Sequence, residues 1–237
     1  MTALWLLVAY AIGCVSFASL VARAHGVDIR EKGSGNPGAT NVSRVVGRGW
    51  GRIVLVLDIL KGLLPVLLLP AVPVPAAPAW LVDSEGRALL AAAVVLGHVF
   101  PVTAGFRGGK GVATLIGGLL ALDPLLAAAA VAVHFLVRRL TGFVSLASVA
   151  LAWTFPALQL ALPALGLLPP GRRDGAGVMA ALALLITLRH APNFARIRSG
   201  TESRHGATSQ PAPARDEARR QVPAEPLPAS RAELKET

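Results

Sequence analysis

Long apolar runs, separated by short polar segments, dominate the chain. The first run covers residues 1–22 without a charge. A cleaved signal peptide would begin with a positively charged region, and no Lys or Arg precedes Arg23, so we interpret the run as a retained span. Further apolar runs occupy residues 53–72, 88–102, 112–137, 142–168 and 175–188. About 20 apolar residues suffice for a helix to cross a bilayer. The pattern therefore predicts an all-α membrane protein.

The number of spans depends on the run over residues 112–137. Asp123-Pro124 interrupts this run with a turn signal, which favours two crossings over one. With two crossings, one side of the membrane receives 19 of the 23 Lys and Arg residues. The remaining four are Lys61, within a span, and Arg87, Arg172 and Arg173 on the opposite side. Because basic residues accumulate in the cytoplasm, we expect seven transmembrane helices with the N-terminus outside and the C-terminus cytoplasmic.

The composition agrees with a membrane domain and distinguishes it from a polar C-terminal segment. The chain is 54% hydrophobic and 15% charged, with a mean hydropathy of +0.59, whereas soluble domains carry about a quarter charged residues. Residues 199–237 hold six basic and six acidic side chains and much Pro and Ala, which predicts a disordered cytoplasmic tail. Residues 1–198, the expected seven-span domain, thus carry the entire surplus of +10, which suits anionic headgroups or anionic substrates.

A first candidate site is the sequence GSGNPGATN at residues 33–41, followed by Arg44. Small residues allow backbone N–H groups to converge on an anion, and Arg44 adds a forked, permanent positive charge. Ser34, Thr40 and Asn41 can add side-chain hydrogen bonds to such an anion, but Ser34 lacks the G-x-S-x-G frame of a nucleophilic serine. The expected phosphate-binding residues here are Gly33, Gly35, Asn36, Gly38, Thr40 and Asn41. The alternative is a solvated loop of turn-forming residues.

A second candidate site is GFRGGKGVAT at residues 105–114, which opens an apolar helix. Glycines followed by a lysine at a helix N-terminus are typical of a phosphate site. The segment is not a Walker A loop, since Ala104 and Gly111 replace its first glycine and its Ser or Thr, so we expect phosphate binding without nucleotide hydrolysis. The expected site residues are Lys110, Gly108, Gly109, Gly111 and Thr114. The alternative is a basic loop that only anchors topology.

A third group combines Ser145 with Arg189, His190, Asn193 and Arg196, at the end of the last apolar run. His190 and Asn193 are three positions apart and would share a helix face. Histidine is suited to proton transfer or to hydrogen bonding of a phosphate, although a histidine at a membrane boundary is also a common interfacial group. Asp58 and Lys61 lie one turn apart within a span, where they would either contact substrate or brace the neighbouring loops.

No metal site is expected. The five histidines show no HExxH spacing, and a single cysteine excludes both a disulfide framework and a cysteine-built zinc site.

Taken in order, the motifs of residues 1–202 resemble those of the bacterial acyl-phosphate glycerol-3-phosphate acyltransferases, the PlsY family. They are GSGNPGATN with Arg44, DxxKG at 58–62, GHxFP at 97–101, GGKGVAT at 108–114 and RHxxNxxR at 189–196. The resemblance implies transfer of a fatty acyl group from acyl phosphate to the 1-hydroxyl of glycerol 3-phosphate, which yields lysophosphatidic acid and phosphate for phospholipid synthesis. The implied catalytic positions are Ser34, Arg44, Lys110, Ser145, His190 and Asn193.

The resemblance further implies a seven-span protein of the bacterial inner membrane with a cytoplasmic active site. It implies no cofactor, no use of acyl-CoA or acyl carrier protein, no nucleic-acid partner, and a functional link to an enzyme that makes acyl phosphate. Which loop holds which phosphate, and whether His190 or a substrate oxygen takes the proton, stay open. The alternative function is a transporter for a small organic phosphate, but the three motif groups lie on one expected side, whereas inverted repeats place paired sites symmetrically.

Overall fold

The computed structural model describes residues 2–71 and 79–204, which form helices and connecting loops without a strand. The α-helices are α1 (Thr2–Gly13), α2 (Phe17–Ala24), α3 (Ala39–Val45), α4 (Arg48–Leu68), α5 (Ser84–Val99), α6 (Val112–Leu122), α7 (Pro124–Thr141), α8 (Val144–Ala164), α9 (Ala176–Arg189) and α10 (Ala191–Arg198). The 3-10 helices are η1 (Leu69–Ala71), η2 (Ala79–Val82), η3 (Val102–Ala104) and η4 (Pro170–Arg173). The all-α prediction is confirmed for this part of the chain, while most of the expected tail, residues 205–237, lies outside it.

Five segments of the described chain are long and apolar enough to cross a membrane. They are Ala3–Ala24, Arg48–Ala71, Ser84–Ala104, Pro124–Thr141 and Val144–Ala164. Helices α9 and α10 provide a sixth if they are taken as one segment bent by 47°. Helix α6 is apolar but has only 11 residues, so a count of seven requires this short helix as a further span.

The expected interruption of the run at 112–137 is present. Asp123 ends α6 and begins α7, and its Oδ1 accepts hydrogen bonds from the backbone N–H groups of Leu125 and Leu126 at 3.1 and 3.2 Å. Pro124 occupies the first position of α7, where its missing N–H costs no intrahelical bond. Capping by Asp123 thus converts one apolar run into two helices.

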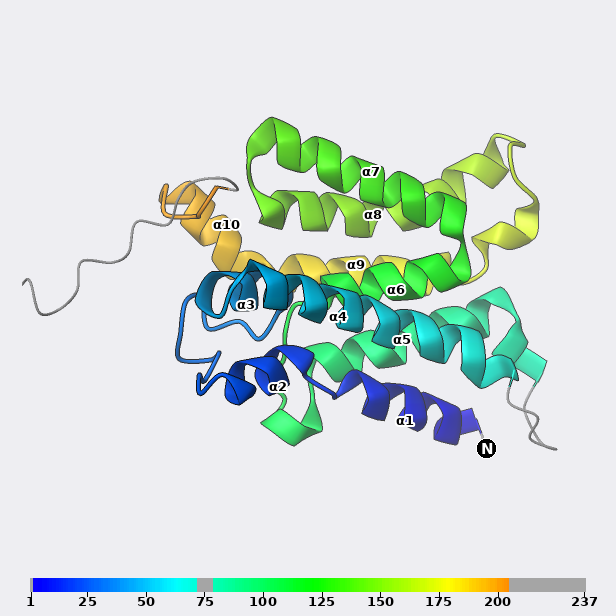
Figure 1. Ribbon diagram of the computed structural model, residues 1–237. Coiled ribbons are helices and arrows are strands. Elements are labelled where there is room, and N and C mark those ends of the chain that lie inside the picture. Colours follow the sequence, from blue (N-terminus) through cyan, green and yellow to red (C-terminus); the bar gives the residue numbers. More distant parts are fainter. Residues whose placement is uncertain (1, 72–78, 205–237) are drawn as a thin grey trace, which may run out of the picture. The chain divides into compact units, whose positions relative to one another are not determined.

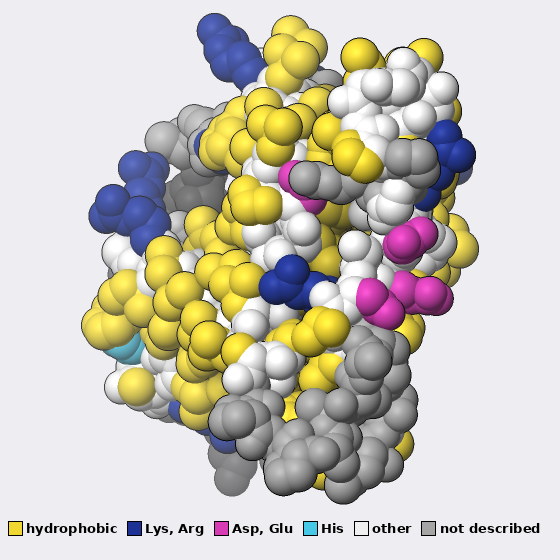
Figure 2. Space-filling view, turned by 90° about the vertical axis from the view of Figure 1, so that its right-hand side faces the viewer, with side chains coloured by type: hydrophobic (Ala, Val, Ile, Leu, Met, Phe, Trp, Pro, Cys, Tyr) yellow, Lys and Arg dark blue, Asp and Glu magenta, His cyan; other side chains and the backbone are white. Residues whose placement is uncertain are grey.

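The helices lie roughly side by side, with α3 and α10 at one end of the bundle and η2 and η4 at the other (Figure 1). Figure 2 shows the end with η2 and η4, where hydrophobic side chains predominate and charged groups of both signs are scattered among them. Apolar side chains also stay exposed on the outer helix faces, among them Leu7 (62%), Leu125 (72%) and Leu140 (74%). Such exposure suits contact with lipid rather than with water.

Helices α4 and α6 approach closely because glycines line their contact. A Cβ atom at Gly62 would lie 2.0 Å from the carbonyl oxygen of Thr114, and one at Gly117 would lie 2.0 Å from that of Ile59. The backbones meet at distances that only glycine permits, as is common in membrane bundles. This contact fixes the helix that begins directly after the second candidate loop.

Candidate active site

The first candidate loop is built around the buried side chain of Asn41, in α3. Its Oδ1 accepts the backbone N–H of Ser34 at 2.9 Å, and its Nδ2 donates to the carbonyl oxygens of Ile29 and Lys32 at 3.1 and 2.9 Å. Gly33 adopts φ +61°, and a Cβ there would lie 2.2 Å from Asn41 Oδ1. The side chain of Asn41 therefore shapes the loop through its hydrogen bonds to the loop's backbone.

The polar side chains of this loop remain available to a ligand. Ser34 and Thr40 are exposed, and so is Arg44, in the last turn of α3. Gly38 begins α3 and donates its N–H to the carbonyl oxygen of Asn36 at 2.9 Å, which closes a tight turn between them. A compact backbone thus presents one hydroxyl group from the loop and one guanidinium group from the helix that follows it.

The second candidate loop is held against the end of α5. The N–H groups of Gly108 and Gly109 each donate at 3.1 Å, to the carbonyl oxygens of Val99 and His98 respectively. A Cβ at Gly108 would lie 2.0 Å from the carbonyl oxygen of His98, so no larger residue fits there without a shift of the backbone. Gly111 follows at φ +83° and begins α6. Lys110 is thus presented from a fixed backbone at a helix N-terminus.

Side chains from three distant parts of the sequence meet at Lys110. Its ammonium group donates a hydrogen bond to Oδ1 of Asn193, in α10. Asn193 Nδ2 in turn donates to Glu202 Oε1 at 2.6 Å, and Ser145 Oγ, at the start of α8, donates to the same oxygen at 3.4 Å. Arg196 Nε binds the other carboxylate oxygen, Glu202 Oε2, at 2.7 Å. The structure therefore brings three of the expected catalytic residues into one network.

The charge of Lys110 is sensitive to these surroundings. Burial lowers the pKa of its ammonium group to about 8, although the carboxylate of Glu202 opposes this shift. Nearby guanidinium groups add to the lowering; they belong to Arg196, Arg44 and Arg189. The influence of Arg44 connects the first candidate loop electrostatically with the second. The site concentrates positive charge, as the binding of anions requires.

His190, between α9 and α10, is 2% exposed. Its Nδ1 lies 2.8 Å from the carbonyl oxygen of Ile186, which can only accept, so Nδ1 carries the proton and Nε2 is an acceptor. Burial and the charge of Lys110 lower the pKa of His190 to about 4. The imidazole is therefore neutral near pH 7 and offers one lone pair.

Three other residues that the sequence singled out, Thr114, Asp58 and Lys61, lie within the helix bundle. Thr114 lies inside α6 at the contact with α4, and its buried hydroxyl group has no hydrogen-bond partner within the described chain. Asp58 and Lys61 form a buried ion pair at 2.8 Å, and Lys61 also donates to the carbonyl oxygen of Val15 at 2.8 Å, at the break between α1 and α2. These contacts brace helices and involve no residue of the Lys110 network.

One residue of the site, Glu202, was not among the sequence-based candidates. Arg189 and Arg196 belong to the third candidate group, and the structure places both close enough to Lys110 to influence its charge. Glu202 lies in the polar segment that composition assigns to the tail, where no pattern distinguishes it. Its carboxylate is held by Asn193 and Arg196, and these hydrogen bonds lower its pKa despite a burial effect that raises it.

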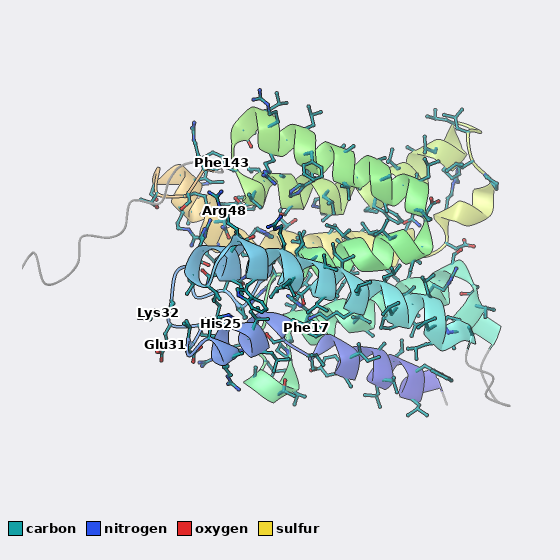
Figure 3. All side chains as sticks on the ribbon, viewed as in Figure 1. Phe17, His25, Glu31, Lys32, Arg48 and Phe143 are labelled. Carbon is teal, nitrogen blue, oxygen red and sulfur yellow. The ribbon has the colours of Figure 1, made fainter. Side chains whose placement is uncertain are left out.

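Other groups of the same bundle end frame the site. Figure 3 labels Glu31 and Lys32, in the loop before α3, as well as Arg48 and Phe143. Arg30 Nη2 donates to the carbonyl oxygen of Arg107 at 3.2 Å, which ties the first candidate loop to the second. Within residues 2–71 and 79–204, no group of three or more His, Cys, Asp or Glu residues could hold a metal ion.

Comparison with known sequences gives one consistent family. A family model described as glycerol-3-phosphate acyltransferase matches residues 3–200. The chain is 40% identical over 200 residues to the glycerol-3-phosphate acyltransferase of Geobacter sulfurreducens, with 84% of this chain and 95% of the relative covered. It is 42% identical over 201 residues to glycerol-3-phosphate acyltransferase 1 of Deinococcus radiodurans, with 85% and 94% covered.

Two solved structures share the fold. Both are crystal structures of PlsY (YgiH), an integral membrane glycerol 3-phosphate acyltransferase. The glycerol 3-phosphate form has a TM-score of 0.72 at 35% identity and covers 86% of this chain and 96% of that one. The lysophosphatidic acid form has a TM-score of 0.70 at 34% identity and covers 86% and 95%.

Proposed function

We propose, from the premise that this chain belongs to the PlsY family of glycerol-3-phosphate acyltransferases, that it transfers a fatty acyl group from acyl phosphate to the 1-hydroxyl of glycerol 3-phosphate. The products are lysophosphatidic acid and inorganic phosphate, and the reaction serves phospholipid biosynthesis. The observation that carries the proposal is the convergence of Lys110, Asn193 and Ser145 beside the loop that begins α6.

The chemistry asks mainly for the positioning of two anions. Acyl phosphate is a mixed anhydride, so its carbonyl carbon is electrophilic and its phosphate is a good leaving group. Two phosphate groups repel each other, and fixed cations with backbone amides offset this repulsion. In our assignment, the Ser34 loop and Arg44 hold acyl phosphate, while Lys110, His190 and Asn193 orient glycerol 3-phosphate.

The bond changes balance without a cofactor. The 1-hydroxyl oxygen of glycerol 3-phosphate forms an ester bond to the acyl carbon, and the bond between that carbon and the phosphate oxygen breaks. The hydroxyl proton leaves with the phosphate, whose oxygens are more basic than an imidazole with a pKa near 4. Nε2 of His190 offers a hydrogen-bond acceptor that orients glycerol 3-phosphate without taking the reacting proton, while the carbonyl oxygen of Ile186 holds the ring.

The same proposal includes the placement of the enzyme. The chain crosses the bacterial inner membrane seven times, with α6 as its shortest span and the candidate site at the cytoplasmic end. The charge asymmetry of the loops supports this orientation. It also suits the reactants, since glycerol 3-phosphate arrives from the cytoplasm and acyl phosphate from the membrane. Residues 199–237 follow the seven-span domain as its tail, whose first residues return Glu202 to the candidate site.

Purified protein in detergent micelles tests the activity directly. We expect phosphate release from palmitoyl phosphate only when glycerol 3-phosphate is present, with lysophosphatidic acid appearing in equal amount by mass spectrometry. Palmitoyl-CoA in place of palmitoyl phosphate is expected to give no product. Lys110→Met removes the ammonium group that binds Asn193 and is expected to abolish turnover without preventing folding. Phosphate release from Lys110→Met at the wild-type rate would refute this role.

Proteoliposomes distinguish the enzyme from the transporter alternative. Radiolabelled glycerol 3-phosphate is supplied outside vesicles that contain the protein, and both uptake and lipid product are measured. The proposed enzyme forms labelled lipid only when acyl phosphate is added. Uptake of intact glycerol 3-phosphate into the lumen without acyl phosphate would instead support transport.

A further inference from the structure

The side chain of Arg189 lies beneath the Gly108–Lys110 loop, although 80 positions separate it from this loop in the sequence. Its Nη2 donates to the carbonyl oxygen of Gly108 at 3.2 Å and to that of Gly109 at 3.4 Å. The guanidinium carbon lies 5.8 Å from the centre of the Phe100 ring, within the range of a cation–π contact. One guanidinium group thus holds two consecutive carbonyl oxygens.

These bonds leave little freedom to the peptide units of the loop. The N–H of Gly109 points at the carbonyl oxygen of His98, while the carbonyl of Gly108, in the same peptide unit, points at Arg189. The C=O and N–H of a trans peptide point in opposite directions, and this unit is consequently clamped from both sides. The next unit joins Gly109 to Lys110 and is clamped through its carbonyl oxygen alone.

We propose that Arg189 is a positioning residue that keeps the backbone N–H of Lys110 directed toward the anion site. With the Gly109 carbonyl bound to Arg189, the Lys110 N–H points away from Arg189, in the opposite direction. Glycine at position 109 would let this peptide unit turn over, because no Cβ hinders it. A turned unit would present a carbonyl oxygen to the phosphate instead of an N–H, and it would repel the anion it should bind.

Arg189 also connects two parts of the site. It is the last residue of α9 and directly precedes His190, so the bonds to the loop fix the distance between this histidine and Lys110. The hydrogen bond from Lys110 to Asn193 makes a second connection to the same C-terminal segment. Loss of Arg189 therefore affects the binding of the substrate more than the folding of the helices.

The inference rests on the proposed acyltransferase function, and the test begins with wild-type turnover. Absence of turnover from palmitoyl phosphate and glycerol 3-phosphate in the wild-type protein would refute the function itself. With the wild type active, Arg189→Ala is expected to raise the KM for glycerol 3-phosphate about tenfold, as loss of charged hydrogen bonds predicts, with a smaller change in kcat. The matched control is Arg198→Ala, an exposed arginine of α10, for which we expect wild-type constants.

Chemical rescue separates positioning from a general requirement for charge. Guanidinium ion, added below concentrations that unfold the protein, is expected to lower the raised KM of Arg189→Ala, whereas ammonium ion at equal ionic strength is not. Arg189→Lys keeps the charge but lacks the planar fork, and is expected to show the raised KM with a melting temperature near that of the wild type. It also replaces Arg189→Ala as the test if the latter does not fold.

Three outcomes would overturn the inference. Unchanged KM values for both substrates in Arg189→Ala would show that the loop does not need Arg189. Full activity of Arg189→Lys would show that a point charge suffices. Equal rescue by ammonium and guanidinium would show the same.

Discussion

Lys110 and Asn193 are 83 positions apart in the sequence, yet their side chains form a hydrogen bond that joins the loop before α6 to helix α10. Asn193 is itself held by Glu202, so the three residues form a chain from ammonium through carboxamide to carboxylate. The carboxylate stabilises the positive charge at the far end of this chain. The contact explains how residues from separate motifs act on one substrate.

The first prediction concerns the alkaline limb of the pH profile. Since burial lowers the pKa of Lys110 to about 8, kcat/KM for glycerol 3-phosphate is expected to fall as pH rises through this value and the ammonium group loses its charge. Glu202 raises the pKa of Lys110, so Glu202→Gln is expected to move the falling limb to lower pH. The measurement is the steady-state rate across pH 6–10 in both proteins.

Glu31→Gln serves as the control for this shift. Glu31 is exposed in the loop before α3, and its removal changes the net charge by the same amount. We expect its limb to coincide with that of the wild type. A limb that stays in place in Glu202→Gln would show that the Glu202 carboxylate does not govern the charge of Lys110.

The second prediction concerns the buried pair of Asp58 and Lys61. Replacement of Lys61 by Met leaves an uncompensated carboxylate and is expected to destabilise the protein by about 3–5 kcal/mol. The double variant Asp58→Asn/Lys61→Met removes that charge and is expected to regain much of the loss. The carbonyl oxygen of Val15 still lacks its donor, so recovery is incomplete.

Thermal unfolding in detergent micelles measures both variants. If the double variant is as unstable as Lys61→Met, the bond to Val15 rather than the ion pair accounts for the stability.

The third prediction concerns the close contact of α4 and α6. Gly62→Ala and Gly117→Ala would each place a Cβ 2.0 Å from a backbone oxygen, and separation of the helices is expected to cost about 1–3 kcal/mol. Gly177, in α9, has no neighbouring atom within 4 Å of an added Cβ, so Gly177→Ala is the matched control. Melting temperatures of the three variants test the difference. Equal melting temperatures for Gly62→Ala and Gly177→Ala would contradict the close packing.

The fourth prediction concerns topology. In a Cys14→Ser background, single cysteines replace Lys32 or Arg107, at the candidate site, and Glu85 or Leu167, at the other end; all four positions are exposed. An impermeant maleimide is expected to label Glu85→Cys and Leu167→Cys in intact spheroplasts. Lys32→Cys and Arg107→Cys are expected to react only after the membrane is permeabilised. Labelling of Lys32→Cys and Arg107→Cys from opposite sides would refute a shared site.

Local sequence was enough to place the main apolar helices and the interruption at Asp123-Pro124, but it did not predict the break between α1 and α2 or the short helices α3 and α10. The Asp123-Pro124 turn followed from capping chemistry, because an aspartate accepts the first N–H groups of a helix and a proline begins it. The ion pair of Asp58 and Lys61 followed from helical spacing. The pattern did not determine whether α6, with 11 residues, crosses the membrane, because an apolar run does not specify where in the bilayer a short helix lies.

For the candidate site too, some features followed from the sequence and others only from the tertiary structure. The sequence by itself determined which residues offer charge and bare amides, and motif order pointed to Ser34, Arg44, Lys110, Ser145, His190 and Asn193. Only the tertiary structure decided three contacts. The side chain of Asn41 binds the backbone of its own loop, Arg189 binds the carbonyl oxygens of the glycine loop, and Glu202 binds Asn193. Side-chain type and helical spacing are local properties, whereas these contacts join segments up to 81 positions apart and depend on how the helices pack.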